Sequence, residues 1–156
     1  NIVCVYSPAW NIPKARLVGV DVSKVKLVNN PDIYCTEILW SLLKNTVPQT
    51  RDPWIVAGDF NSSPTFDWMW GPKPRGNQEF IKRMNDVGLT DCLSDYLGEL
   101  VPTFQNSSDK RILHQLDYIY VSENLRTKLV SAEVFKKSSV LIDSVSDHFP
   151  IVCVFS

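Results

Sequence analysis

The chain has 156 residues, of which 44% are hydrophobic and 21% charged, a composition that excludes a disordered, collagen-like or coiled-coil protein. No apolar run approaches the roughly 18 residues that a bilayer-spanning helix needs, so no transmembrane segment is expected. The 16 Lys and Arg residues nearly balance the 17 Asp and Glu residues. Proteins that bind nucleic acid tightly and non-specifically usually carry a surplus of basic residues. The near balance of charge disfavours such binding here, but it does not exclude a local basic patch.

Short stretches rich in Val, Ile and aromatic residues are predicted to be β-strands. In chain order they cover residues 2–6, 54–58, 101–105, 116–121 and 151–155. Residues 10–29 and 66–76 are expected to form loops. The second loop contains Trp68 and Trp70, for which two interpretations stay open: packing against the body of the protein, or a platform that faces the substrate.

Two helices are predicted between these strands. The first starts at Pro31 and carries apolar side chains at every fourth residue through Leu42. The second covers residues 77–87, with Gly88 as its C-terminal cap, and a weaker helical stretch covers residues 122–130. Because strands and helices mix without strict alternation, the sequence predicts an α/β or α+β layered fold with a mixed sheet.

The four cysteines do not form a metal-binding or redox motif. Cys4, Cys35, Cys92 and Cys153 include no Cys-x-x-Cys pair, and each has apolar neighbours, so all four are expected to be buried free thiols. Free thiols slightly favour a reducing, cytoplasmic setting, although the sequence leaves the localisation unknown.

The first of three polar clusters follows the strand at residues 54–58. Asp59 and Asn61 are two residues apart, so they share one face if the strand continues through them. On that face the carboxylate could bind a metal-bound water, and the amide could bind a phosphate oxygen. The alternative is a plain strand-ending turn, because Asp and Asn both favour turns.

The second and third clusters also lie at strand ends. Asp117 interrupts an apolar strand, and a buried carboxylate needs a partner; the alternative is an exposed strand face. Asp147 and His148 precede the last strand, where a carboxylate can hold a hard cation and an imidazole can donate to a phosphoryl oxygen. The other histidine, His114, is expected at the surface or at a strand edge.

Together the clusters indicate one kind of chemistry. Oxygen ligands with one imidazole and no thiolate suit Mg²⁺ or Mn²⁺, and such a set fits metal-assisted phosphoryl hydrolysis. The sequence contains no Gly-x-Ser-x-Gly, His-Glu-x-x-His or P-loop motif, which disfavours serine acyl transfer, zinc proteolysis and P-loop nucleotide hydrolysis.

The clusters resemble the motifs of the endonuclease/exonuclease/phosphatase superfamily, which includes DNase I. The matching stretches are Gly58-Asp59-Phe60-Asn61, Leu116-Asp117-Tyr118 and Ser146-Asp147-His148-Phe149-Pro150. Their order and spacing agree, and the connecting segments extend the match over nearly the whole chain. The resemblance implies a DNase I-like four-layered α/β sandwich, here partial, with mixed sheets flanked by helices and the site at one rim of two facing sheets.

The resemblance also implies catalytic roles. Asp59 would orient or deprotonate the attacking water, and Asn61 would help to bind the scissile phosphate. His148 would stabilise the phosphoryl oxygens while Asp117 holds its ring and charge. Tyr6 matches a position where many members place a Tyr or His near the phosphate.

For the cofactor, the resemblance implies Mg²⁺ or Mn²⁺ with Asp147 as a ligand, directly or through water. Gln115 stands where many members carry Arg. The principal Glu ligand of the family is expected in a missing N-terminal half, so residues 1–156 are interpreted as a single, N-terminally truncated domain. Since half a sandwich exposes strand edges and apolar faces, self-association or pairing with the missing half is expected.

The function predicted from these features is divalent-metal-dependent hydrolysis of a phosphodiester by activated water, with nucleic acid as the substrate. Two alternatives stay open. One is a phosphatase of the same superfamily that acts on a phospholipid, an inositol phosphate or a small phosphomonoester. The other is a catalytically inert, truncated module, and the sequence does not decide whether this chain alone is an active enzyme.

Overall fold

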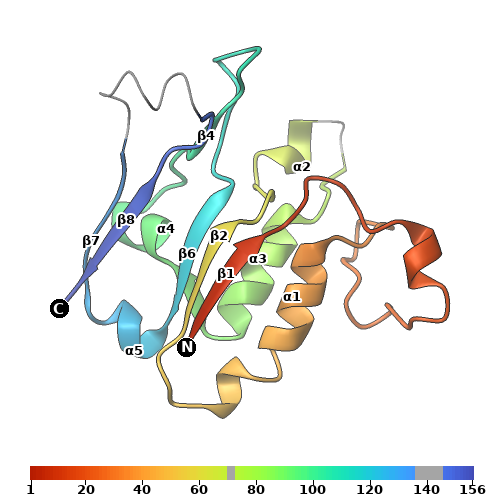
Figure 1. The fold of residues 1–156 in the computed structure, drawn as a ribbon, viewed down its shortest axis with the longest axis horizontal. Coiled ribbons are helices and arrows are strands. Elements are labelled where there is room, and N and C mark those ends of the chain that lie inside the picture. The colour runs from red at the N-terminus through yellow and green to blue at the C-terminus, as the bar shows by residue number, and fades with distance from the viewer. Residues whose placement is uncertain (70–72, 136–145) are drawn as a thin grey trace.

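The structure, a computed structural model, describes residues 1–69, 73–135 and 146–156; Trp70 lies outside the described residues. The main sheet has the strand order β1-β2-β6-β3. These strands are β1 (Ile2–Tyr6), β2 (Ile55–Asp59), β6 (Asp117–Ser122) and β3 (Leu89–Asp91). Since β1 is parallel to β2 while both other pairs are antiparallel, the sheet is mixed, as predicted (Figure 1).

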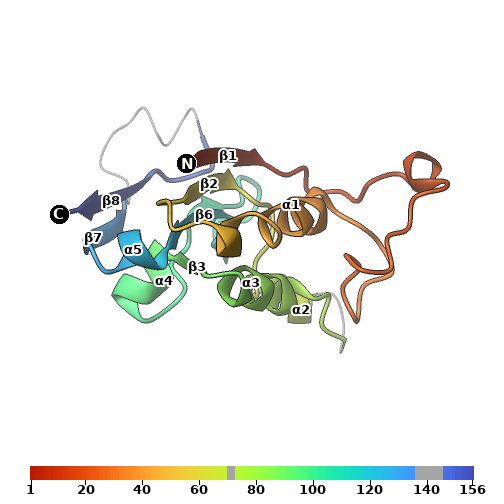
Figure 2. The ribbon, with the colours of Figure 1, turned by 90° about the horizontal axis from the view of Figure 1, so that it is seen from below.

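A second sheet faces the main one. It consists of β7 (Leu129–Val134) and β8 (Ile151–Phe155), which are antiparallel. Figure 2 shows this pair on one side of the main sheet, with α1 and α3 on the opposite side. A small hairpin, formed by β4 (Phe104–Gln105) and β5 (Leu113–His114), completes the described strands.

Helices flank these sheets. α1 (Cys35–Leu43) and α3 (Asn77–Asp86) cover one face of the main sheet. The shorter helices are α2 (Phe66–Met69), α4 (Cys92–Leu97) and α5 (Glu123–Arg126), and two 3-10 turns cover Lys14–Leu17 and Val47–Gln49. Among the helices of the described residues, none has the length and apolar character needed to cross a membrane.

The alternating side chains of β6 explain why two layers pack against the main sheet. Tyr118 and Tyr120 are buried in the core beneath α1 and α3, whereas Ile119 and Val121 belong to the core between the sheets. Asp117 therefore projects toward the β7–β8 side. Its place at the first residue of β6 puts the carboxylate at the rim between the two sheets, as the sequence predicted.

Several boundaries differ from the prediction. The first helix begins at Cys35 because Tyr34 is extended, and Glu37 caps the helix by accepting from the Tyr34 N–H at 2.6 Å. The strand expected over residues 101–105 is reduced to β4, and the expected loop over residues 66–76 contains α2. The stretch at 122–130 divides into α5 and the start of β7. The sequence also did not predict β3, α4, β5, most of β7 or the two 3-10 turns.

The expectation of four buried thiols is wrong for three of them. Only Cys92 is buried; Cys35 and Cys153 are half-buried, and Cys4 is exposed. Cys4 lies on β1 between Ile2 and Tyr6, whose side chains share its face and are each 74% exposed. An apolar strand pattern identifies a face but does not determine whether another layer covers it.

Candidate active site

Asp59 and Asn61 form the first part of the site, where β2 ends. Asn61 has a left-handed backbone with φ of 46°, which Asn tolerates better than most residues. Its N–H donates to Asp59 Oδ1 at 2.8 Å, and its Nδ2 donates to Asp59 Oδ2 at 2.7 Å. Nδ2 also donates to the Ser7 carbonyl at 2.8 Å. The segment is therefore a strand-ending turn, and this turn fixes the orientation of the Asp59 carboxylate.

Asp117 and His148 form a hydrogen-bonded pair. The His148 Nδ1 atom lies 2.8 Å from Asp117 Oδ2, and the two side chains are 31% and 20% exposed, respectively. The hydrogen bond to Asp117 raises the pKa of His148 above its ordinary value, although partial burial opposes that rise. Because Nδ1 is hydrogen-bonded to the carboxylate, Nε2 is the ring nitrogen that can bind a substrate.

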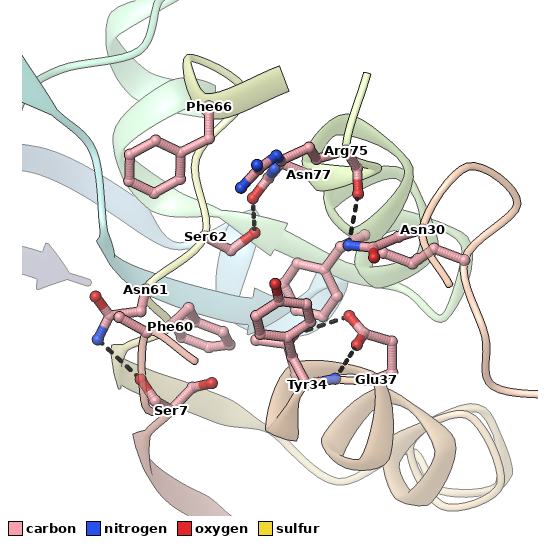
Figure 3. A pocket seen from close by; sticks show the side chains of 14 residues that line it. Ser7, Asn30, Tyr34, Glu37, Phe60, Asn61, Ser62, Phe66, Arg75 and Asn77 are labelled. Atoms are coloured by element: carbon pink, nitrogen blue, oxygen red, sulfur yellow. Dashed lines mark hydrogen bonds between the residues drawn. The ribbon is translucent and has the colours of Figure 1, made fainter. Parts of the chain in front are cut away.

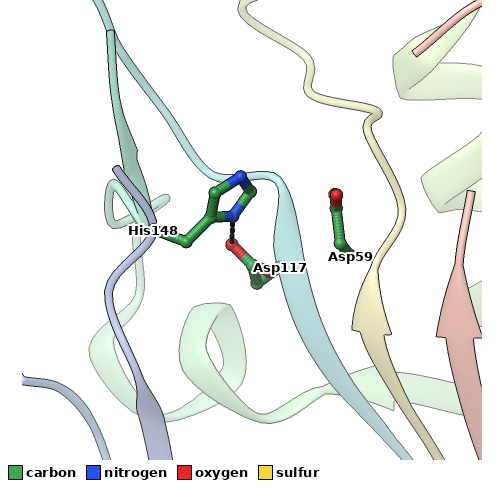
Figure 4. Close-up of side chains that lie close together, drawn as sticks. All are labelled: Asp59, Asp117 and His148. Atoms are coloured by element: carbon green, nitrogen blue, oxygen red, sulfur yellow. Dashed lines mark hydrogen bonds and ion pairs between the residues drawn. The ribbon is translucent and has the colours of Figure 1, made fainter. Parts of the chain in front are cut away.

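The pair lies opposite Asp59. Asp59 and Asp117 are register partners on adjacent antiparallel strands, which places their side chains on one face. Ligand atoms of Asp59, Asp117 and His148 all lie within 4.8 Å of one another. Figure 4 shows the three side chains, with the His148 ring bonded to Asp117. Burial raises the pKa of Asp59, and the nearby Asp117 charge raises it further. A carboxylate of increased basicity thus faces an imidazole of increased proton affinity.

Thr103 holds both members of the pair in place. Its buried Oγ1 accepts from the backbone N–H groups of Leu116 and Asp117, each at 3.0 Å. Its carbonyl accepts from the Phe149 N–H at 2.6 Å, so one residue ties Asp117 to the segment that carries His148. The sequence reading missed this role; the only local signal was a small polar residue within an otherwise apolar strand pattern.

Aromatic rings support His148 from the other side. The Phe104 ring meets the His148 ring edge-on, with 5.1 Å between centroids, and stacks with His114 at 6.2 Å. His114 is only 5% exposed, and its Nδ1 lies 2.7 Å from Thr65 Oγ1. Of the two positions expected for His114, the surface is wrong, whereas an edge strand is what the structure shows, since His114 belongs to β5 of a two-stranded sheet. Burial lowers the pKa of His114, which favours a neutral ring in this aromatic stack.

Tyr6 and Asp147 lie at the periphery of this group. Tyr6 is the register partner of Asp59 on β1, but its side chain is 74% exposed. Asp147 is exposed and does not belong to the three-residue group, although its carbonyl is fixed by the Gln105 N–H at 2.9 Å. Four of the predicted site residues therefore come together: Asp59, Asn61, Asp117 and His148. Tyr6 and Asp147 lie at the periphery of this group.

The described carboxylates offer part of a divalent-metal site. Both Asp59 oxygens accept from Asn61, and Asp117 Oδ2 is bound to His148. The exposed Asp147 carboxylate and Asp117 Oδ1 remain as hard oxygen donors. Mg²⁺ prefers six oxygen ligands and usually keeps several waters, so these donors fit a metal that is shared with substrate, water and further acidic ligands.

Known structures share this architecture. An apurinic/apyrimidinic (AP) endonuclease from Archaeoglobus fulgidus is 20% identical with a TM-score of 0.68, over 99% of this chain and 60% of that chain. A 3′ phosphatase, NExo, from Neisseria, whose structure holds a product DNA hairpin, is 23% identical with a TM-score of 0.62, over 77% of this chain and 52% of that chain. The chain thus spans between half and three-fifths of these proteins, and the likeness establishes the DNase I-like fold.

Sequence comparison agrees with the structural comparison. No curated protein matches the sequence. The family model described as "Endonuclease/Exonuclease/phosphatase family" matches residues 23–148, a range that contains the Asp59 turn and the Asp117–His148 pair. The chain therefore belongs to the endonuclease/exonuclease/phosphatase family.

Proposed function

We propose that this chain provides the catalytic face of a divalent-metal-dependent phosphoesterase that hydrolyses phosphodiester bonds in nucleic acid. The observation that carries the proposal is the Asp117-supported His148 ring facing Asp59, with ligand atoms of all three residues within 4.8 Å of one another. This arrangement supports a base and a hydrogen-bond donor that act together on one phosphate, as in-line attack of water on phosphorus requires.

Asp59 is the proposed general base. Burial and the nearby Asp117 charge raise its pKa, which makes the carboxylate a better proton acceptor than an exposed aspartate. His148, whose pKa the hydrogen bond to Asp117 raises, would donate from Nε2 to a phosphoryl oxygen as negative charge develops there. Asp117 orients this ring and does not itself transfer a proton.

Asn61 is proposed to orient Asp59 and to contact the scissile phosphate. An amide nitrogen has two protons, and both are engaged in this structure, one by Ser7 and one by Asp59. Contact with a phosphate therefore requires Asn61 to exchange one of these partners when substrate binds. Tyr6, at the rim next to Asp59, is proposed to approach the same phosphate.

Asp147 is proposed to hold Mg²⁺ or Mn²⁺, with the principal Glu ligand supplied from outside residues 1–156. When bound, the metal would neutralise charge on the phosphoryl group. The chain spans only 52% to 60% of the similar solved structures named above. We therefore propose that activity requires pairing with an N-terminal half that supplies this Glu, and that self-association of residues 1–156 would cover exposed faces without completing the metal site.

Nucleic acid is favoured as the substrate by the similar proteins, which are described as an AP endonuclease and as a phosphatase bound to a DNA hairpin. The second of these favours a further candidate reaction, removal of a 3′-terminal phosphate from DNA, which differs from the open alternative of a phosphatase acting on a phospholipid, an inositol phosphate or a small phosphomonoester. The other open alternative, a catalytically inert module, predicts no hydrolysis of either bond.

A two-substrate assay tests the proposal. One DNA oligonucleotide carries only internal phosphodiesters and the other a 3′-terminal phosphate; each is incubated with Mg²⁺ and with this chain or any longer product of its gene. Substituting His148→Ala or Asp59→Asn should lower the rate by at least about 100-fold, whereas the exposed Asp86→Asn should not change it. An unchanged rate in either site variant would reject the assignment.

A further inference from the structure

A pocket of about 190 Å³ lies beside Asn61, among residues that the proposed mechanism does not use. Figure 3 shows it between the turn that follows β2, the N-terminal segment and the starts of α1 and α3. Because Asn61 lines the pocket and also binds Asp59, the pocket and the proposed phosphate site share one wall. Drug-sized ligands occupy pockets of roughly 300–1,000 Å³, so this one suits a smaller group.

The walls combine aromatic rings with amides. Phe66 and Tyr34 contribute rings, and Asn30 and Asn77 contribute side-chain amides. Asn77 Nδ2 donates to Asp67, and Asn30 Nδ2 donates to the Arg75 carbonyl. Each amide nitrogen has a second proton, for which the described residues show no acceptor. These amides can therefore bind a ligand without losing the bonds that hold them.

Arg75 adds a positive charge to the lining. Its backbone is fixed, because its N–H donates to Asp67 at 2.9 Å and its carbonyl accepts from Asn30 at 3.1 Å. The residue as a whole is exposed, and within the described part of the chain its guanidinium has no ion-pair partner. The fixed backbone keeps this side chain beside the pocket, and a guanidinium there suits a phosphate at the pocket mouth.

Ser7 supplies the observation that indicates a ligand. It is only 2% exposed, yet its Oγ has no hydrogen-bond partner among the described residues. Its carbonyl oxygen binds Asn61, while its hydroxyl lies on the Tyr34 side, within the pocket (Figure 3). Buried hydroxyl groups are normally paired, so this one is placed to bond with an occupant.

We propose that this pocket binds one nucleobase of the substrate strand, next to the phosphate at Asn61. The inference rests on the proposed function, because it assigns the base to the same strand. Aromatic walls favour a flat ring by stacking, and amides and a hydroxyl can pair with its polar edge. A sugar or a free phosphate would make little use of the two rings.

Binding without catalysis tests the pocket directly. A deoxynucleoside 5′-monophosphate and inorganic phosphate are titrated separately into the chain with EDTA present, and binding is followed by calorimetry. The mononucleotide should bind at least about tenfold more tightly than phosphate, since stacking adds to the phosphate contact. Ala9→Phe, at an exposed position on the lining, should block the pocket and remove this advantage.

Ser7→Ala is the sharpest variant, because it removes only an atom without a partner. It should weaken mononucleotide binding roughly five- to tenfold while leaving the urea unfolding midpoint unchanged or slightly higher. Ser41→Ala, on α1 away from the pocket, is the matched control and should alter neither quantity. Equal affinity for mononucleotide and phosphate, or unchanged mononucleotide affinity in both Ser7→Ala and Ala9→Phe, would overturn the proposal.

A variant of His148, in the Asp117–His148 pair, separates this inference from the proposed function. His148→Ala should abolish hydrolysis but retain the preference for mononucleotide over inorganic phosphate, because His148 does not line the pocket that holds the base. If the wild-type protein hydrolyses DNA but does not prefer the mononucleotide over phosphate, only the pocket assignment is rejected. If the protein prefers the mononucleotide but hydrolyses neither substrate, the proposed function is rejected and the pocket assignment is retained.

Discussion

His148 Nδ1 lies 2.8 Å from Asp117 Oδ2, and this bond joins the two sheets at their common rim. Asp117 begins β6 in the main sheet, whereas His148 lies just before β8 in the second sheet. The orientation of the imidazole is therefore set by a contact between layers. Any change that separates the sheets at this rim should alter the proton affinity of His148.

Substituting Asp117→Asn should shift the titration of His148. The Asp117 carboxylate raises the pKa of His148, so its removal should lower that pKa, and the imidazole should lose its proton at a lower pH. NMR titration of the imidazole signals measures this directly. The chain has only two histidines, and buried His114 is the internal control whose pKa should not move. An unchanged His148 pKa would show that the pair does not exist in solution.

The same variant makes a kinetic prediction. If Asp59 acts ionised and His148 acts protonated, the rate should rise with pH as Asp59 ionises and fall as His148 loses its proton. Since Asp117 raises the pKa of both groups, Asp117→Asn should move both limbs of the profile to lower pH. Its maximal rate should fall by about 100-fold or more. A profile whose limbs stay in place would contradict the proposed roles.

Thr103→Val tests how the rim is held together. The variant keeps the side-chain shape but leaves the N–H groups of Leu116 and Asp117 without their acceptor. We expect the free energy of unfolding, measured in urea, to fall by about 2–3 kcal/mol, and the His148 pKa to fall with it. Thr90→Val is the matched control, because within the described residues the Thr90 hydroxyl makes no hydrogen bond. A stable Thr103→Val variant with an unchanged His148 pKa would refute this positioning role.

The strands and the acidic residues at their ends could be predicted because they depend on local pattern. Apolar runs identified β1, β2 and β8, and polar residues that interrupt such runs identified Asp59 and Asp117. β3 has only three residues, too few for a periodic signal, and it exists because it pairs with β6. Cysteine exposure was mispredicted because it depends on which faces are covered, which is a tertiary property.

The supporting residues of the site could not be predicted for a related reason. Thr103 acts through backbone groups 13 and 14 residues away, and Ser7 through Asn61, 54 residues away. Neither residue type suggests such a role by itself. His114 was expected at the surface or at a strand edge; it does lie in the short strand β5, but the structure buries it beside Phe104 and Phe66.

Gly58 makes the close approach of β1 to β2 possible, and Gly58→Ala should be strongly destabilising. Its φ is 142°, and a Cβ there would lie 2.0 Å from the Val5 carbonyl oxygen. We expect a loss of at least about 3 kcal/mol in the free energy of unfolding, from backbone strain and from displacement of β1. Gly98→Ala, with φ of 74° and no atom within 4 Å, is the control and should cost about 1 kcal/mol. Equal losses would show that the approach of β1 does not constrain residue 58.

Metal binding by this chain should be weak. Of the oxygens at the site, both in Asp59 and one in Asp117 already accept hydrogen bonds and so offer a metal fewer lone pairs, and Asp147 lies outside the group of Asp59, Asp117 and His148. We expect a dissociation constant of about 10⁻³ M or weaker, measured by Mn²⁺ titration with electron paramagnetic resonance. Asp147→Asn should weaken binding further, while exposed Asp86→Asn should not. Micromolar affinity, or affinity unchanged by Asp147→Asn, would contradict this prediction. It would mean that the metal replaces the hydrogen bonds to Asn61 and His148 and that the site rearranges around it.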